Sequence, residues 1–260
     1  MLQIKVGVQL ASLKLPLKQA LHTAARMQAD AVEIDLRKDL PAEELSRSAI
    51  RQLRKMMEDL NLRVSAASFR TRRGYHVLDD LDRRVEATKR AMSLAYDLGA
   101  SVVVNHIGRV PPETDETAWN TMLQALADIG RHGQRVGATL LAETATESGE
   151  QLAGLIKALP AGSIGVDLNP GLLVLNGHSP HEAAKALADH VLHVHATDAT
   201  HDVAQGRGFL VPLGRGSVDY ADILSILEER QYRGYLTIER RESEDPVYEI
   251  SQAVQYLRSM

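Results

Sequence analysis

Short apolar runs alternate with longer amphipathic segments from one end of the chain to the other. Eight of these runs have the length and the Val, Ile and Leu content of strands buried in a parallel sheet. They cover residues 3–8, 31–36, 62–67, 101–106, 138–143, 163–168, 190–195 and 235–239. Between them, apolar residues recur at helical spacing, most clearly over residues 42–60. The pattern therefore predicts strand–helix units repeated eight times.

Prolines, glycines and a serine mark the expected helix ends. Pro41 and Pro180 stand where a first helical turn accepts proline, and Ser179 is a good cap before the second of them. A left-handed residue commonly stops a helix just before a strand. The residues expected in this role are Gly99, Gly137, Gly234 and Asn61.

Eight strand–helix units within 260 residues suit a single (β/α)8 TIM barrel of the α/β class, formed by residues 1–260 as one domain. An open, doubly wound sheet would more often carry a glycine-rich dinucleotide motif after its first strand. Here the first strand runs into "QLASLKL", which contains no glycine. The closed barrel is therefore the predicted fold.

Composition narrows the classes of partner. A hydrophobic content of 44% is enough for a full core, and a net charge of −4 gives no broad basic face for nucleic acid or an anionic membrane. There is no cysteine, which excludes disulfides and thiolate chemistry. No apolar run reaches membrane length, and Lys5 and Lys14 interrupt the first one. We expect a soluble cytoplasmic protein with a small-molecule carbohydrate partner. The sequence leaves open whether the chain forms a homo-oligomer.

Four consecutive strands end in groups that do not belong in an apolar core. Glu143 ends the fifth strand, Asp167 and Asn169 share one face at the end of the sixth, His195 ends the seventh and Glu239 ends the eighth. In such a barrel the carboxyl ends of the strands meet at one mouth. Burying several carboxylates together is costly unless a cation offsets them. The set suits one divalent ion such as Mn²⁺, Mg²⁺, Co²⁺ or Zn²⁺, whereas outward-facing salt bridges are the alternative.

The second half of the chain resembles the xylose-isomerase-like TIM barrels, the sugar phosphate isomerase/epimerase superfamily. The segments that carry the resemblance are "LLAET", "HVHATD" and "VPLGRGSVDYADILSILEERQYRGYLTIE". That group includes hydroxypyruvate isomerases, ketose 3-epimerases and inosose dehydratases. The resemblance implies that Glu143, an acid on the sixth strand, His195 and Glu239 bind one divalent metal ion.

The sixth strand departs from the family pattern. Relatives usually carry Asp followed three residues later by a substrate-contacting His, but Pro170 stands three residues after Asp167. In the alternative register the ligand position is Asn169, and Leu172 replaces the His. We favour Asp167 as the ligand and keep Asn169 as the alternative. Thr197 also stands where relatives often have Lys.

Other polar residues near the strand ends are weaker candidates. His106 and Arg37 could hold substrate oxygens, whereas His193 lies deeper and is expected in the core. Glu33 could support the metal ligands from the second strand. The segment "LGRGS" could cradle a phosphate, although a tight turn before a helix is the favoured interpretation.

Together these features predict a metal-dependent isomerase or epimerase of carbohydrate metabolism. A chelated ketone would lose a proton to one of the two catalytic glutamates, Glu143 or Glu239, and the other would return a proton to the enediolate. Loss of a β-hydroxyl from the same enediolate would instead give a lyase or dehydratase. A sugar-binding barrel with an impaired metal site is the non-enzymatic alternative.

Overall fold

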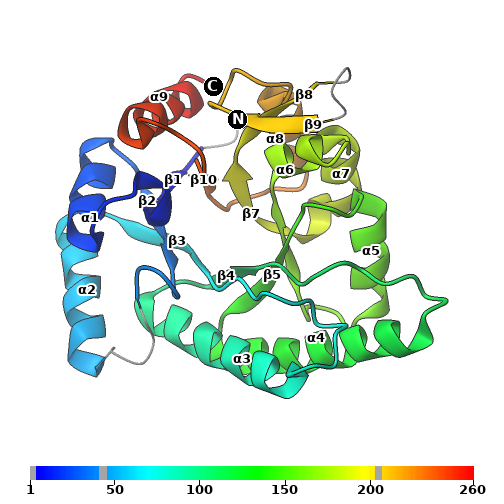
Figure 1. The fold of residues 1–260 in the computed structure, drawn as a ribbon. Helices are drawn as coiled ribbons and strands as arrows, with labels where there is room; N and C mark the ends of the chain where they lie inside the picture. Colours follow the sequence, from blue (N-terminus) through cyan, green and yellow to red (C-terminus); the bar gives the residue numbers. More distant parts are fainter. Residues whose placement is uncertain (1–3, 41–45, 203–206) are drawn as a thin grey trace.

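The computed structural model describes residues 4–40, 46–202 and 207–260. Eight parallel strands close into a barrel in the order β1–β10–β7–β6–β5–β4–β3–β2, and the helices surround it on the outside (Figure 1). Each of the eight predicted strand segments overlaps one of these strands, and β1, β3 and β7 end one residue beyond the predicted segment. The predicted TIM barrel is confirmed.

The barrel strands are β1 (Val6–Gln9), β2 (Ala31–Asp35), β3 (Arg63–Ser68), β4 (Val102–Asn105), β5 (Thr139–Glu143), β6 (Gly165–Leu168), β7 (Val191–Ala196) and β10 (Leu236–Ile238). The α-helices are α1 (Leu17–Arg26), α2 (Arg47–Asp59), α3 (Leu81–Leu98), α4 (Glu116–Val136), α5 (Gly149–Ala158), α6 (Pro170–Leu175), α7 (Pro180–Leu187), α8 (Tyr220–Glu229) and α9 (Pro246–Arg258). Among the described residues, 3-10 helices cover Leu10–Leu13 and Ala188–His190. Among the described helices, none is both long and apolar enough to cross a membrane.

The barrel closes where β1 pairs with β10. Val6 pairs with Leu236, and Gly7 pairs with Thr237. A Cβ atom added to Gly7 would lie 2.5 Å from the Thr237 hydroxyl oxygen, so the absence of a side chain there makes room for that hydroxyl. The floor of the barrel is therefore polar at this point, directly below the strand ends that carry the candidate site.

Most of the predicted helix ends are confirmed. Ser179 accepts a hydrogen bond from Glu182 N and caps α7, with Pro180 in its first turn. Gly99 and Gly137 close α3 and α4 in the left-handed conformation, and Asn61, one residue beyond the cap of α2, is also left-handed. Pro41 and the start of the predicted helix at residues 42–45 lie outside the described residues; α2 begins after Ser46, which caps it.

The prediction for Gly234 is wrong. The left-handed residue after α8 is Gln231, at φ 56°, and Gly234 does not have a positive φ. A Cβ atom on Gly234 would instead lie 2.2 Å from the Tyr232 hydroxyl and 2.6 Å from the Leu192 carbonyl oxygen. This glycine is thus explained by close packing before β10.

An antiparallel hairpin follows β7 and was not predicted. Its strands are β8 (Asp198–Asp202) and β9 (Arg207–Val211), and they pair from Asp198↔Val211 to Asp202↔Arg207. Figure 1 shows the hairpin beside α6, outside the ring of barrel strands. The first strand, "DATHD", is mostly polar, so hydrophobic patterning gives no signal for it.

Two glycines bring together the loops that follow β3 and β4. Gly108 has φ 89°, and a Cβ atom on it would lie 2.1 Å from the Gly74 Cα. The same pair of loops is joined by a hydrogen bond from Tyr75 N to Ile107 O, of 2.9 Å. The loop after β3 is therefore held against the mouth of the barrel, where it contributes a side chain to the site.

We expect Gly108→Ala to destabilise the fold more than Gly99→Ala. Both glycines are left-handed, so each alanine costs about 1–2 kcal/mol of backbone strain. A Cβ atom on Gly108 would also collide with backbone atoms of Gly74, which adds roughly 1–3 kcal/mol of overpacking. A Cβ atom on Gly99 would have no neighbouring atom within 4 Å, so this second cost is absent there. Denaturant unfolding of the two variants measures the difference, and equal losses would show that the loop contact is not tight.

Candidate active site

Three of the four predicted ligands meet at the carboxyl ends of their strands. Glu143 is the last residue of β5, His195 lies near the end of β7 and Glu239 follows β10. Each has one potential ligand atom within 4.8 Å of those of the other two. The three residues are at most 5% exposed. The sequence thus locates the mouth of the barrel as the place where acidic and imidazole groups converge.

Asp167 lies on β6, in register with Glu143 of β5, and is fully buried. Its two carboxylate oxygens pair with the two histidines of β7, at 2.7 Å from His193 Nδ1 and 2.6 Å from His195 Nδ1. Burial alone would raise the pKa of Asp167, but the imidazoles outweigh it and hold that pKa well below its usual value. Asp167 is therefore a buried carboxylate already paired with nitrogen donors.

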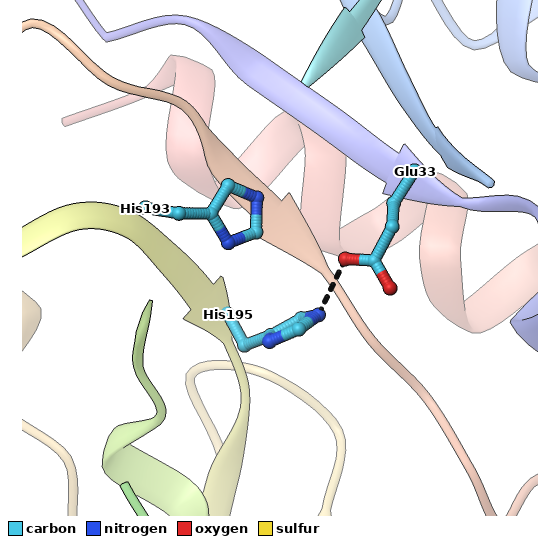
Figure 2. A group of neighbouring side chains, drawn as sticks. All are labelled: Glu33, His193 and His195. Carbon is cyan, nitrogen blue, oxygen red and sulfur yellow. Dashed lines mark hydrogen bonds and ion pairs between the residues drawn. The ribbon is translucent and has the colours of Figure 1, made fainter. Parts of the chain in front are cut away.

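Glu33, on β2, approaches His195 from the opposite side. Figure 2 shows its carboxylate beside the His195 ring, where Oε2 lies 2.7 Å from Nε2. Although burial opposes charge, Asp167 and Glu33 raise the pKa of His195 well above its usual value. His195 is then an imidazolium that donates one hydrogen bond to each carboxylate.

His193 is fully buried beneath the mouth. Its Nε2 lies 2.7 Å from the Thr237 hydroxyl, which in turn donates to the Ser65 hydroxyl at 2.9 Å. Glu33, His193 and His195 also have ligand atoms within 4.8 Å of one another, so they form a second group with metal-like spacing. Every ring nitrogen in that group already has a hydrogen-bonding partner within the protein.

Two arginines that the sequence pattern did not single out reach into the site. Arg70 Nη2 lies 3.1 Å from Glu143 Oε1 and 3.0 Å from Glu239 Oε1. Arg241 donates from Nε to Glu239 Oε1 at 2.8 Å and from Nη2 to Glu143 Oε1 at 3.2 Å. Each guanidinium thus bridges both carboxylates. Their side chains are 26% and 34% exposed, so they also reach the solvent side of the mouth.

The loop that carries Arg70 is anchored by buried side chains. Asn105, at the end of β4, accepts hydrogen bonds from the Thr71 backbone N and hydroxyl and donates to the Tyr75 hydroxyl. The Tyr75 hydroxyl also pairs with Thr88 of α3 at 2.7 Å. Asn105, Tyr75 and Thr88 are fully buried. The position of Arg70 is therefore set by interactions inside the fold.

The segment that carries Arg241 is hydrogen-bonded to the 3-10 helix after β1 and to α9. The backbone N of Arg240 donates to the Ser12 hydroxyl at 3.0 Å, and its side chain pairs with Glu249 of α9. Ser12 also donates to Gln9, whose amide nitrogen donates to Glu33 and to Glu239. Two adjacent arginines thus face different partners, and only Arg241 faces the site.

Asn169 presents its amide nitrogen to the carboxylates. Its Oδ1 accepts hydrogen bonds from the Leu172 backbone N at 3.2 Å, as the cap of α6, and from the Thr197 hydroxyl at 2.5 Å. Because a backbone N–H can only donate, this contact fixes which end of the amide is oxygen. Nδ2 then donates to Glu143 Oε1 at 2.8 Å and to Glu239 Oε2 at 3.3 Å. Of the two strand-six candidates, Asn169 and not Asp167 contacts both carboxylates.

The electrostatics of the site follow from these contacts. Burial would raise the pKa of Glu239, but His195 and the two arginines outweigh it and hold the pKa well below its usual value. Burial would likewise lower the pKa of Arg70, but Glu143 and Glu239 raise it further above its usual value. Glu239 and Arg70 are therefore charged together, and each stabilises the charge of the other.

One oxygen of the site stays free. Glu143 Oε2 is buried and has no hydrogen-bond partner among the described residues. His106 Nδ1 lies 3.3 Å from it without hydrogen-bond geometry. Burial lowers the pKa of His106, and its side chain is 34% exposed. This predicted residue therefore lies at the site as a neutral imidazole between Glu143 and solvent.

Other predicted site residues lie elsewhere. Arg37 is exposed, with its guanidinium 4.3 Å from the centre of the Phe69 ring, and its contact with substrate stays a prediction. The "LGRGS" loop folds around Asp198, whose Oδ2 accepts hydrogen bonds from the backbone N of Gly214 and Gly216. The amides that could have held a phosphate already bind a carboxylate of the chain itself, as the tight-turn interpretation requires.

The spacing of Glu143, His195 and Glu239 would admit a divalent ion, but the state of their donor atoms does not fit one. Oε1 of Glu143 and both oxygens of Glu239 accept N–H donors, and both His195 nitrogens are paired. Asn169 offers N–H where an ion needs an oxygen. Glu143 Oε2 alone among these ligand atoms is unpaired in the described part of the chain, and a metal ion that used the others would have to displace the Arg70 and Arg241 guanidiniums.

The chain matches known proteins over most of its length. A family model described as "Xylose isomerase-like TIM barrel" matches residues 21–260. Among curated proteins, the inosose dehydratase of Bacillus thuringiensis (strain Al Hakam) is 22% identical over 218 residues, which cover 72% of each chain.

Solved structures with the same fold cover nearly the whole chain. A xylose isomerase domain protein from Planctomyces limnophilus superposes with a TM-score of 0.86 at 22% identity, covering 98% of this chain and 96% of that one. A xylose isomerase-like TIM barrel protein from Mycobacterium smegmatis in complex with magnesium superposes with a TM-score of 0.76 at 19% identity, covering 100% of this chain and 96% of that one. An L-ribulose 3-epimerase superposes with a TM-score of 0.75 at 21% identity, covering 96% of this chain and 86% of that one. At these identities the likeness is one of fold.

We expect Asp167→Asn to lower the free energy of unfolding by roughly 3–5 kcal/mol, because it leaves a buried imidazolium with one of its two counter-charges removed. Asp245→Asn is the matched control. Asp245 caps α9 by accepting from Tyr248 N, and asparagine caps equally well, so its effect should stay within about 0.5 kcal/mol. Denaturant unfolding measures both; equal small effects would contradict the charged arrangement.

Proposed function

The chain belongs to the xylose isomerase-like TIM barrel family, and from that premise we propose that it is an enzyme that moves a proton next to a carbonyl group. The substrate is a small hydroxy-carbonyl compound, such as a sugar or keto-polyol, bound at the mouth of the barrel. The relatives named as dehydratase and epimerase both support this class of substrate.

The free oxygen of Glu143 carries the proposal. A general base needs an unshared lone pair at the site, and Glu143 Oε2 is the carboxylate oxygen there that has no hydrogen-bond partner among the described residues. Its other oxygen is fixed by Arg70, Arg241 and Asn169, so the carboxylate is held in one orientation. These contacts support Glu143 as the base that removes a proton from a carbon beside the carbonyl.

The negative charge that develops on the substrate oxygen needs fixed positive partners. Arg70 and Arg241 supply them at the mouth, and Arg70 Nε is a buried donor without a hydrogen-bond partner in the described part of the chain. Donors that are already oriented stabilise such an oxyanion with little reorganisation. The two arginines thus take the role of electrophile in the proposed reaction.

His106 connects Glu143 with solvent. It is neutral at neutral pH because burial lowers its pKa, and its Nδ1 lies 3.3 Å from the free Glu143 oxygen. A neutral imidazole at this position can pass a proton between the carboxyl group and water or a substrate hydroxyl. We assign it the role of proton relay.

Glu239 differs from Glu143 in its contacts. Both of its oxygens accept hydrogen bonds, from Arg70, Arg241, Gln9 and Asn169. The sequence-based expectation that it returns a proton to the enediolate stays a prediction. Its contacts favour another role, in which it stays ionised and holds the two guanidiniums in position.

The outcome of the reaction depends on the step after proton removal. Reprotonation at the neighbouring carbon gives an isomerase, and reprotonation on the opposite face gives an epimerase. Loss of a β-hydroxyl gives a dehydratase, which agrees with the name of the curated relative. The proposed reaction uses no metal ion held by Glu143, Asp167 or Asn169, His195 and Glu239, because every potential ligand atom of this set except Glu143 Oε2 is already hydrogen-bonded.

The proposal predicts exchange of a substrate C–H with solvent deuterium, even without net turnover. A panel of keto-sugars, inososes and small hydroxy-ketones is incubated with the protein in D₂O, in separate arms with EDTA and with Mn²⁺, and followed by NMR. Glu143→Gln should abolish exchange, because an amide cannot accept the proton; a loss of at least about 100-fold is expected. New signals identify isomer, epimer or dehydrated product.

Glu150→Gln is the control, because Glu150 is exposed in the first turn of α5. It should exchange like the unaltered protein. Exchange that persists in Glu143→Gln would rule out Glu143 as the base. Binding of a panel compound without any exchange, seen by ligand NMR, would favour the sugar-binding alternative.

A further inference from the structure

We infer that Arg70 and Arg241 are built-in counter-charges that take the place of the divalent ion expected from the family resemblance. The barrel mouth then works with two fixed guanidinium groups and holds no resident metal. This inference goes beyond the proposed reaction, because it concerns which cation the site accepts. Its test measures metal binding, so it can fail while the proton-transfer proposal stands.

The first support is the balance of formal charge. Glu143 and Glu239 contribute two negative charges, and the guanidiniums that bridge them contribute two positive ones. A divalent ion added between the carboxylates would leave these four side chains with two excess positive charges. Because buried charges are costly unless they are paired, the arginines and a metal ion compete for the same two carboxylates.

The second support is Asn169. An ion at this position needs a carboxylate or carbonyl oxygen from strand six. The Asn169 oxygen is turned away, toward the Leu172 backbone N and the Thr197 hydroxyl, and its NH₂ group faces the two glutamates. The amide therefore acts as a third hydrogen-bond donor to the same carboxylates and reinforces the arginines.

The third support is His195. A histidine ligand binds a metal ion through one ring nitrogen and uses the other for a supporting hydrogen bond. In this chain His195 Nδ1 lies 2.6 Å from Asp167 Oδ2, and Nε2 lies 2.7 Å from Glu33 Oε2. Both ring nitrogens are therefore hydrogen-bonded to carboxylates other than Glu143 and Glu239.

The fourth support is the way in which both arginines are held. Arg70 follows β3 in a loop fixed by the buried Asn105 and Tyr75, and by the close Gly74–Gly108 contact. Arg241 follows a residue whose backbone and side chain are both anchored, to Ser12 and Glu249. Loosely held surface arginines would not have such supports, so the two guanidiniums are fixed parts of the site.

The exchange of a metal for two guanidiniums changes what the site recognises. Guanidinium groups donate hydrogen bonds in a plane and in fixed directions, and they stay charged at any physiological pH. They suit a substrate that presents one or two adjacent oxygens, including a developing enediolate. Arg70 Nε, buried and unpaired among the residues that the structure describes, is one donor available for this purpose.

The first experiment measures metal in the unaltered full-length chain. After dialysis without chelator, elemental analysis should find far less than one Mn, Co or Zn ion per chain. Neither EDTA nor added Mn²⁺, Mg²⁺ or Zn²⁺ should shift the thermal unfolding midpoint. About one tightly held ion per chain, with a lower midpoint after EDTA treatment, would overturn the inference.

The second experiment restores metal binding. Asn169→Asp supplies the missing carboxylate, and Arg241→Gln removes one competing charge. The double variant should bind Mn²⁺ ~10–100-fold more tightly than the unaltered chain, by calorimetry, which is the range typical of changes around metal ligands. Each single variant should show part of the gain. Arg240→Gln removes the same charge one residue away, where the side chain faces Glu249, and should show none.

The results of these measurements separate the alternatives. A gain confined to Asn169→Asp, Arg241→Gln and their combination supports the replacement of metal by arginine. Equal Mn²⁺ affinity in the unaltered chain and the double variant contradicts it. If the double variant does not fold, the single variants and the metal content of the unaltered chain still decide. C–H exchange in the EDTA arm tests the reaction itself, independently of this result.

Discussion

The structure depends on one electrostatic constraint, because two carboxylates are buried side by side at the mouth of the barrel. The parallel strands end at the same edge of the barrel, so Glu143 and Glu239 meet there with at most 5% exposure. Two unit charges 4 Å apart interact by about 4 kcal/mol at an effective dielectric constant of 20. A counter-charge is therefore required, and in this chain Arg70 and Arg241 provide it. The loops after β3 and β10 are built to hold those two side chains.

The charges form two neighbouring hydrogen-bonded groups. In the first, the His195 imidazolium lies between Asp167 and Glu33, and His193 connects Asp167 to the Thr237 hydroxyl. In the second, two glutamates meet two arginines and the Asn169 amide, and Gln9 links the groups by donating to Glu33 and Glu239. Among the described residues, Glu143 Oε2 and Arg70 Nε lack a partner in the second group, and exceptions of this kind are expected at a functional site.

The sequence reveals the barrel and the position of the mouth, but not the state of the site. Strands buried on both faces give continuous apolar runs, and the strand ends identify Glu143, His195 and Glu239 directly. Arg70 and Arg241 follow strands in loops, where no periodicity marks their direction. A charged residue within three positions of a strand end is the one signal that could have indicated them. Whether Asn169 offers oxygen or nitrogen depends on Leu172 and Thr197, which sequence patterns cannot place. Gly234 shows the same limit, since its role depends on Tyr232 and Leu192.

The most direct test of a metal-free mouth is a crystal structure of the unaltered protein grown with millimolar Mn²⁺ and measured at a wavelength where manganese scatters anomalously. The charge arrangement predicts guanidinium density from Arg70 and Arg241 between Glu143 and Glu239, the Asn169 oxygen directed to Leu172 N, and no anomalous peak at the mouth. A manganese peak coordinated by Glu143, Glu239 and His195, with the arginines displaced, would contradict it.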